Sequence, residues 1–224
     1  MGDTVYGNKS GDTVYGNKYV HDGVLGRRDT ILLLSADPDG HGRLQLDEER
    51  RAIDREVAYS RAARRLEVRT ADALRIDDLQ QALLRHRPIV AHFSGHGHPR
   101  EGIQVVDQRG RPRAVPPSAL SGLFGILKTG LRCVVLNACH TSEQAEAIAV
   151  HVPCVIGMRR RVLDETAILF ATGLYRGFAD GQTIQASFKL ARNNLDLNGV
   201  PELDVPQLVT RPGAADRPLI SGLF

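Results

Sequence analysis

The sequence predicts an α/β domain in which a mostly parallel sheet is covered on both faces by helices. Two observations carry this prediction. Short, nearly continuous apolar runs, such as residues 31–35 (ILLLS), are typical of strands that are buried on both faces. These runs alternate along the chain with longer amphipathic segments, and regular alternation of strands and helices is typical of such a parallel sheet.

The expected strands follow from these apolar runs. Residues 103–107 and 113–115, with Gly110 between them, form an expected hairpin. The other expected strands are 31–35, 66–70, 88–94, 132–138 and 153–158.

The expected helices follow from apolar residues at helical spacing and from their end signals. In 46–65, charged residues alternate with an apolar stripe. A proline near the start and Gly130 just beyond the end bound 117–128. The pair Asp180-Gly181 separates the last two helices. The full expected set is 46–65, 77–85, 117–128, 141–150, 164–179 and 183–195.

Composition narrows the classes of function. The 224 residues carry 29 basic and 26 acidic side chains, and a net charge of +3 argues against nucleic acid or a membrane surface as a partner. No apolar run is long enough to span a bilayer, and the N-terminus lacks the pattern of a signal peptide. Three cysteines without a C-x-x-C pair argue against a disulfide framework and favour a cytoplasmic location.

An octapeptide repeat divides the chain into a tail and a domain. GDTVYGNK occurs at residues 2–9 and again at 11–18. Each copy combines a β-favouring Thr-Val-Tyr core with turn residues, so the copies can stack on each other or on other chains. A flexible polar tail is the alternative interpretation. We therefore expect a repeat-bearing tail and linker over 1–29 and one domain over 30–224, irregular from about residue 199.

Two predicted strand ends carry reactive side chains. One strand runs into Ser94-Gly95-His96-Gly97, and the other into Asn137-Ala138-Cys139. The carboxyl ends of parallel strands meet at one edge of a sheet, so His96 and Cys139 can face each other there. An imidazole that takes the thiol proton makes the cysteine a nucleophile, and the backbone amides of Gly97 and Cys139 can stabilise the developing oxyanion.

These two elements resemble the CHAT branch of the caspase-like peptidases over roughly residues 30–195. The resemblance implies a caspase-like three-layer αβα sandwich and a cysteine endopeptidase that cleaves a protein substrate without a metal or other cofactor. It assigns the base to His96 and the nucleophile to Cys139. The octapeptides are similar to bacterial amyloid signalling motifs. That similarity implies a defence or cell-death effector activated by a signalling protein with a matching motif, or by self-assembly.

The sequence offers three charged residues for the pocket that selects the substrate. Related peptidases often place a charged residue in the pocket for the side chain before the cleaved bond. Asp37 and Asp164 are candidates that favour a basic side chain, whereas Arg161 favours an acidic one. The sequence does not choose among these candidates or an apolar pocket.

Two other classes of function compete with the peptidase. One is a non-catalytic interaction module of the same fold. The other is a metal-dependent hydrolase in which His92, His96 and His98 bind zinc together with Cys139 or His140. We rank both below the Cys139–His96 pair. Two further expectations are that His92 is a hydrogen-bonded strand histidine or a helper of the site, and that the remaining cysteines, Cys133 and Cys154, are structural.

Overall fold

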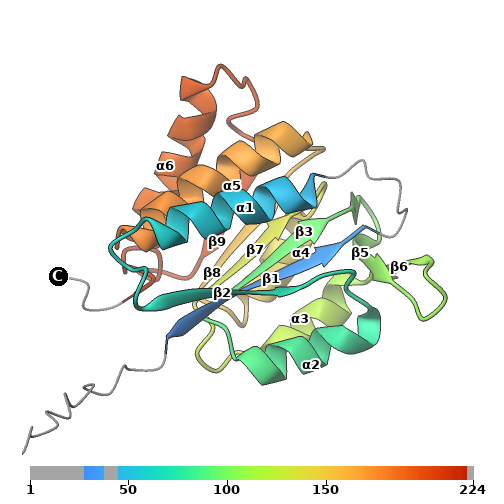
Figure 1. Ribbon diagram of the computed structural model, residues 1–224. Coiled ribbons are helices and arrows are strands. Elements are labelled where there is room, and N and C mark those ends of the chain that lie inside the picture. The colour runs from blue at the N-terminus through green and yellow to red at the C-terminus, as the bar shows by residue number, and fades with distance from the viewer. Residues whose placement is uncertain (1–27, 38–44, 221–224) are drawn as a thin grey trace, which may run out of the picture.

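The computed structural model describes residues 28–37 and 45–220, and its centre is a six-stranded sheet (Figure 1). The strand order is β2-β1-β3-β7-β8-β9. The first five strands are parallel to their neighbours, and β9 runs antiparallel to β8. The strands are β1 (Asp29–Ala36), β2 (Leu66–Ala71), β3 (Val90–Gly95), β7 (Cys133–Asn137), β8 (Cys154–Met158) and β9 (Pro206–Thr210).

Helices cover both faces of this sheet, as Figure 1 shows. One face carries α1 (Leu46–Ala58), α5 (Asp164–Ala179) and α6 (Ile184–Leu197). The other carries α2 (Ile76–His86), α3 (Pro117–Ile126) and α4 (Ser142–Ala149). The predicted α/β fold with a mostly parallel sheet between two helical layers is therefore confirmed.

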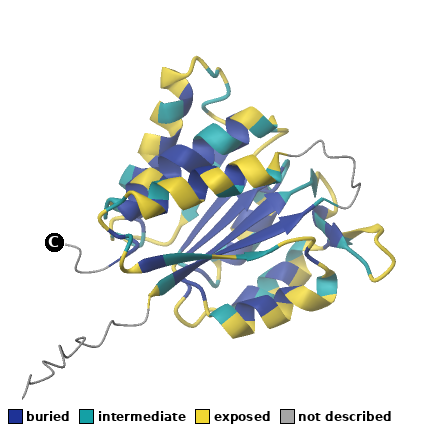
Figure 2. Ribbon diagram, in the orientation of Figure 1, coloured by how far each residue is buried: buried dark blue, intermediate teal, exposed yellow. Residues whose placement is uncertain are grey.

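The alternation of side chains along β1 shows why its apolar run is continuous. Ile31 and Leu33 point into the core beneath α1, α5 and α6, whereas Leu32 and Leu34 point into the core beneath α2, α3 and α4. All four are at most 2% exposed. A strand covered on both sides needs apolar residues at every position, and Figure 2 shows the central strands of the sheet in dark blue, as buried.

A small second sheet extends the chain beyond the carboxyl end of β3. It contains β4 (Gly97–His98), β5 (Gly102–Val106) and β6 (Pro112–Val115), paired antiparallel in that order. The hairpin of β5 and β6 was expected from the sequence, but β4 was not. This sheet fixes the segment that follows His96.

Two expectations about secondary structure were wrong. Helix α1 ends at Ala58 rather than near residue 65, because the Ser60 hydroxyl bonds to the Val57 carbonyl and accepts the Ala62 N–H, so the chain turns there. Strand β9 lies in the C-terminal stretch that was expected to be irregular. It begins with Pro206, and a strand at the edge of a sheet tolerates proline.

The octapeptide repeat at 2–9 and 11–18 lies outside the described residues, and its role as an assembly motif stays a prediction. Within 28–37 and 45–220, no helix has the length and apolar character needed to cross a bilayer.

The core gives a direct test of the fold. Phe170 of α5 is fully buried and packs edge-on against Phe188 of α6, with ring centroids 5.9 Å apart. We expect Phe170→Ala to lower the free energy of unfolding by about 3–5 kcal/mol, because the substitution leaves a cavity and removes the contacts of the ring with both helices and the sheet. Denaturant unfolding followed by circular dichroism measures the change.

Leu197→Ala is the matched control, since Leu197 is 77% exposed at the end of α6. Its unfolding free energy should stay within about 0.5 kcal/mol of the wild type. Equal destabilisation by the two substitutions would contradict the packing described here.

Candidate active site

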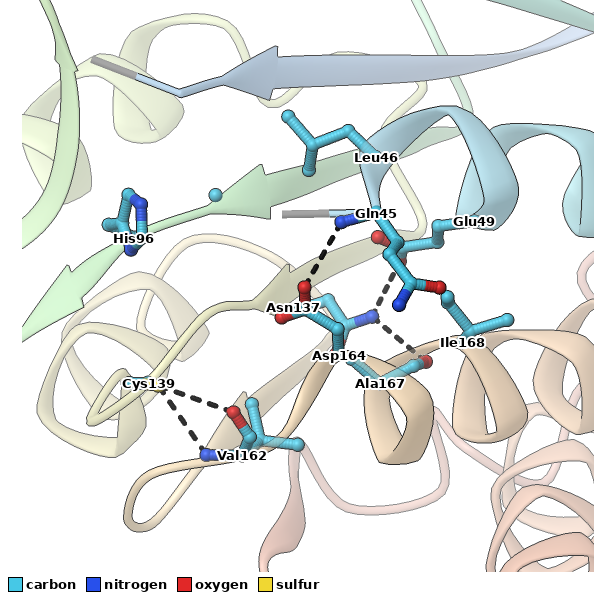
Figure 3. A pocket seen from close by; sticks show the side chains of 11 residues that line it. Gln45, Leu46, Glu49, His96, Asn137, Cys139, Val162, Asp164, Ala167 and Ile168 are labelled. Carbon is cyan, nitrogen blue, oxygen red and sulfur yellow. Dashed lines mark hydrogen bonds between the residues drawn. The ribbon is translucent and has the colours of Figure 1, made fainter. Parts of the chain in front are cut away.

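The pairing of β3 with β7 brings the two predicted strand ends together. These strands are parallel neighbours, and Ser94 lies opposite Asn137 in their register. His96 therefore leaves the sheet two residues beyond Ser94, and Cys139 two residues beyond Asn137. Both line one pocket at this edge (Figure 3). Its other lining residues are Gln45, Leu46, Glu49, Gly95, Asn137, Val162, Asp164, Ala167 and Ile168.

Two glycines permit the close contacts on either side of His96. A Cβ atom at Gly95 would lie 2.6 Å from the carbonyl oxygen of Ala36 in β1. A Cβ atom at Gly97 would lie 1.9 Å from the carbonyl oxygen of Cys139. Any side chain at residue 97 would therefore collide with the backbone of Cys139. Packing therefore requires glycine on both sides of His96.

The hydrogen bonds between β4 and β5 determine the direction of the Gly97 amide. The Gln104 N–H donates to the His96 carbonyl at 2.9 Å, and Gly97 lies opposite Ile103. In an antiparallel ladder this pattern makes Gly97 and Ile103 a non-hydrogen-bonded pair. The Gly97 N–H therefore points away from β5, on the free side of the edge strand β4.

Thr141 ties down the turn that carries Cys139. Its hydroxyl lies 3.0 Å from the carbonyl oxygens of both Leu136 and Ala138, and it accepts the Met158 N–H at 2.9 Å. Its own N–H donates to the Met158 carbonyl at 2.8 Å. Between Cys139 and Thr141, His140 adopts a left-handed backbone conformation with φ of 55°. These bonds hold the tight turn between β7 and α4.

The Cys139 sulfur contacts the loop between β8 and α5. It accepts the Val162 N–H at 3.4 Å and lies 3.7 Å from the Val162 carbonyl oxygen (Figure 3). Cys139 is partly exposed, whereas Cys133 and Cys154 are fully buried. Burial raises the pKa of the Cys133 thiol strongly and also raises the pKa of the Cys154 thiol. Both cysteines are therefore structural, as expected from the sequence.

A buried chain of polar side chains supports the wall of the pocket. The Tyr175 hydroxyl lies 2.9 Å from Nδ1 of His92, and Oε1 of Glu49 lies 2.9 Å from Nε2 on the other side of the ring. The Asn137 amide nitrogen donates to the same Glu49 oxygen. Burial strongly raises the pKa of Tyr175, so its hydroxyl keeps its proton. His92 is thus the hydrogen-bonded strand histidine that the sequence suggested.

These hydrogen bonds leave one acceptor of Asn137 without a partner. The Asn137 amide nitrogen also donates to the Ala167 carbonyl at 3.1 Å, so both of its hydrogens have acceptors. Its Oδ1 atom is buried and has no hydrogen-bond partner among the described residues. A buried acceptor without a partner is unfavourable unless an incoming group supplies a donor.

The structure separates the three candidates for substrate selection. Asp164 lines the pocket, and its Oδ2 atom accepts the Gln45 N–H at 3.0 Å. Asp37 does not line the pocket; its Oδ1 atom lies 3.6 Å from Nε2 of His96. Arg161 is exposed and is not among the residues of the pocket wall.

The zinc alternative has no support in the described residues. Over 28–37 and 45–220, no three His, Cys, Asp or Glu side chains are placed to hold a metal ion together. His92 is fully buried and bonded to Glu49 and Tyr175, and His98 is exposed beside Glu101. The histidines at 92, 96 and 98 therefore face different surroundings.

Comparison with known families agrees with this geometry. The CHAT domain matches residues 20–201, which include the whole pocket. The chain belongs to the CHAT domain family. No curated protein matches it at the level of sequence.

Solved structures with a similar fold include two named proteases. A secreted C11 cysteine protease from Bacteroides thetaiotaomicron, solved with an irreversible peptide inhibitor, aligns with a TM-score of 0.59 and 9% identity over 82% of this chain. This chain spans 66% of that protease. Caspase-1 from Spodoptera frugiperda aligns with a TM-score of 0.52 and 10% identity, over 82% of this chain and 87% of its own. The CHAT domain here therefore has the caspase-like fold.

Sequence reasoning missed several residues of the pocket. Glu49 had a readable signal, since it lies at helical spacing from Leu46 and Ile53 and so falls on the apolar stripe of α1. A carboxylate on such a stripe needs a buried partner. Gln45 and Val162 had no signal, because their places depend on how α1 and the loop before α5 fold over the sheet edge.

The contact between Gly97 and Cys139 can be tested by adding one methyl group. We expect Gly97→Ala to lower the rate of Cys139 alkylation by iodoacetamide at least about tenfold, because the new Cβ displaces the Cys139 backbone. Mass spectrometry of the alkylated peptide over time measures the rate.

Gly122→Ala provides the control. Gly122 lies in α3, and no atom lies within 4 Å of a Cβ added there. The alkylation rate of this variant should equal that of the wild type. A wild-type rate in Gly97→Ala would show that the contact does not position Cys139.

Proposed function

We propose that this CHAT domain is a cysteine endopeptidase with Cys139 as nucleophile and His96 as its base. The observation that carries the proposal is the shared pocket: of the three thiols, only Cys139 is partly exposed, and it lines the same wall as His96. The two residues come from neighbouring strands at the carboxyl edge of a parallel sheet, where reactive groups gather in open α/β folds.

The proposed reaction uses these two side chains in turn. His96 takes the Cys139 proton, and the sulfur attacks the peptide carbonyl to form a tetrahedral intermediate. Protonated His96 then gives its proton to the leaving amine, which leaves a thioester on Cys139. His96 next takes a proton from water, and the resulting hydroxide attacks the thioester and expels the Cys139 thiolate. Protonated His96 returns its proton to this thiolate, so the acid product leaves and the free thiol and neutral imidazole are restored.

The oxyanion of the intermediate needs donors, and Gly97 supplies one in this proposal. Its N–H points away from β5, and its Cα packs against the Cys139 backbone. The Cys139 N–H is the proposed second donor. Preorganised backbone donors of this kind typically contribute a factor of about 10²–10³ to the rate each.

The pocket favours a basic substrate residue before the cleaved bond. Its wall carries the carboxyl groups of Asp164 and Glu49 and the unpaired oxygen of Asn137, and oxygens of these kinds can accept hydrogen bonds from a substrate. Among the residues that the structure describes, no lysine or arginine belongs to the wall. A lysine or arginine side chain of the substrate would supply both donors and opposite charge.

We further propose that the protein is a cytoplasmic effector of a bacterial defence or cell-death pathway. In this proposal the octapeptides at 2–9 and 11–18 assemble with each other or with a matching motif on a signalling protein. Clustering through such repeats raises the effective concentration of the attached domains.

Peptides of residues 2–18 should form thioflavin-binding fibrils, and a peptide that stays monomeric when seeded would contradict this role.

A non-catalytic module of the same fold is the second candidate. The contact of the Cys139 sulfur with both backbone groups of Val162 favours it, since this contact holds the thiol in the resting structure. Reaction of Cys139 with an electrophilic peptide probe distinguishes the two candidates.

The nucleophile and base can be tested with a peptide library. We expect Cys139→Ala to abolish cleavage and His96→Gln to lower kcat/KM by at least about 10³-fold, because each removes one half of the reacting pair. Mass spectrometry identifies the new termini. Cys154→Ala should retain activity, since Cys154 lies in the core; cleavage that persists without Cys139 would rule out this nucleophile.

Substrate preference tests the acidic pocket. We expect Asp164→Asn to lower kcat/KM about five- to tenfold for peptides with arginine or lysine before the cleaved bond, because the pocket loses a partly exposed negative charge. Glu165→Gln removes a charge one residue further along, outside the wall, and should leave kcat/KM unchanged. A wild-type preference for acidic or apolar residues would contradict this assignment.

A further inference from the structure

Among the described residues, Asp37 carries the acidic group closest to a ring nitrogen of His96. Asp37 follows the last residue of β1, and its Oδ1 atom lies 3.6 Å from the Nε2 atom of His96. This separation is longer than a hydrogen bond, and the contact becomes an ion pair when His96 carries a second proton. The Asp37 side chain is 20% exposed and the His96 side chain 34%, so solvent screens the pair only partly.

The sheet itself creates this pairing. Strands β1 and β3 are parallel neighbours, and Ala36 lies opposite Gly95 in their register. The absence of a side chain at Gly95 permits the close approach of its Cα to the Ala36 carbonyl. The next residue on each strand is therefore Asp37 on one side and His96 on the other. Their contact follows from the register and does not depend on the conformation of a long loop.

Several other titratable groups lie around this edge of the sheet. Among the described residues, Asp37 is the only carboxylate within 4.0 Å of a His96 ring nitrogen. Four of the other groups have contacts elsewhere: Cys139, which contacts Val162; Glu49, which holds His92 and Asn137; Asp164, which accepts the Gln45 N–H; and His98, which lies 4.0 Å from Glu101. His140 follows Cys139 in the turn after β7.

We propose that Asp37 is a positioning residue for His96 rather than a residue of the substrate pocket. Its carboxylate faces Nε2, which leaves Nδ1 as the ring nitrogen for the proton of Cys139. When His96 carries that proton, the negative charge of Asp37 stabilises the imidazolium. This inference rests on the proposed function, because it assigns Asp37 to the orientation of the proposed base.

The first test measures His96 directly and needs no substrate. In the Cys139→Ala background, NMR follows the His96 imidazole signal against pH, and His96→Gln identifies that signal. We expect Asp37→Asn to lower the midpoint of this titration by about half to one pH unit, because the imidazolium loses its negative neighbour. Asp37→Glu should keep most of the wild-type midpoint. An unchanged midpoint in Asp37→Asn would overturn the proposal.

The second test measures the consequence for Cys139. With iodoacetamide at neutral pH as the probe, we expect Asp37→Asn to slow alkylation of Cys139 about five- to tenfold and Asp37→Glu to restore much of the rate. Asp72→Asn is the matched control, since Asp72 is exposed and follows β2 at the same sheet edge. Equal slowing by Asp72→Asn would show that the loss of any negative charge at this edge slows alkylation. That result would contradict a positioning role for Asp37.

The two proposals fail separately. If His96→Gln leaves alkylation and peptide cleavage unchanged, the proposed dyad is wrong whatever Asp37 does. If His96→Gln removes reactivity but Asp37→Asn leaves both the titration midpoint and the alkylation rate at their wild-type values, the dyad stands and only the role of Asp37 is wrong.

Discussion

The close approach of two backbones, at Gly97 and Cys139, is the constraint on which the candidate site depends. Parallel pairing of β3 and β7 brings their carboxyl ends to one edge, but strands in register still leave the following loops free to diverge. The contact between the Gly97 Cα and the Cys139 carbonyl removes that freedom. It couples the small sheet, which holds the chain after His96, to the turn fixed by Thr141. The two reactive segments thus share one rigid frame.

Next to this site, the core contains a hydrogen-bonded set of buried polar side chains. Glu49 and His92 are buried, and removing such groups from water costs free energy that their mutual contact only partly returns. The hydrogen bonds of these groups orient the neighbouring side chains. Glu49 holds the Asn137 amide so that its oxygen remains unpaired at the pocket, and Tyr175 fixes the other side of His92. These buried hydrogen bonds hold the wall of the candidate site in one arrangement.

The sequence predicted the layers of the fold and the strand ends that carry His96 and Cys139, because apolar runs and glycines report burial and close contacts within a few residues. It could not predict what depends on distant register. Asp37 was one of three candidates for the substrate pocket, and the sequence did not show that the pairing of Ala36 with Gly95 places it beside His96. Strand β9 was missed because its pairing with β8 decides its conformation, whereas its composition suggested irregular structure.

The three cysteines show how the fold assigns different chemistry to one residue type. Cys133 and Cys154 lie opposite each other on β7 and β8, inside the sheet, where burial raises the pKa of both thiols and disfavours the thiolate. Cys139 lies only six residues beyond Cys133, but the strand has ended and the turn after it exposes the sulfur to the pocket. Of the three thiols, Cys139 is thus the one that lines the pocket, and burial disfavours thiolate formation at the other two.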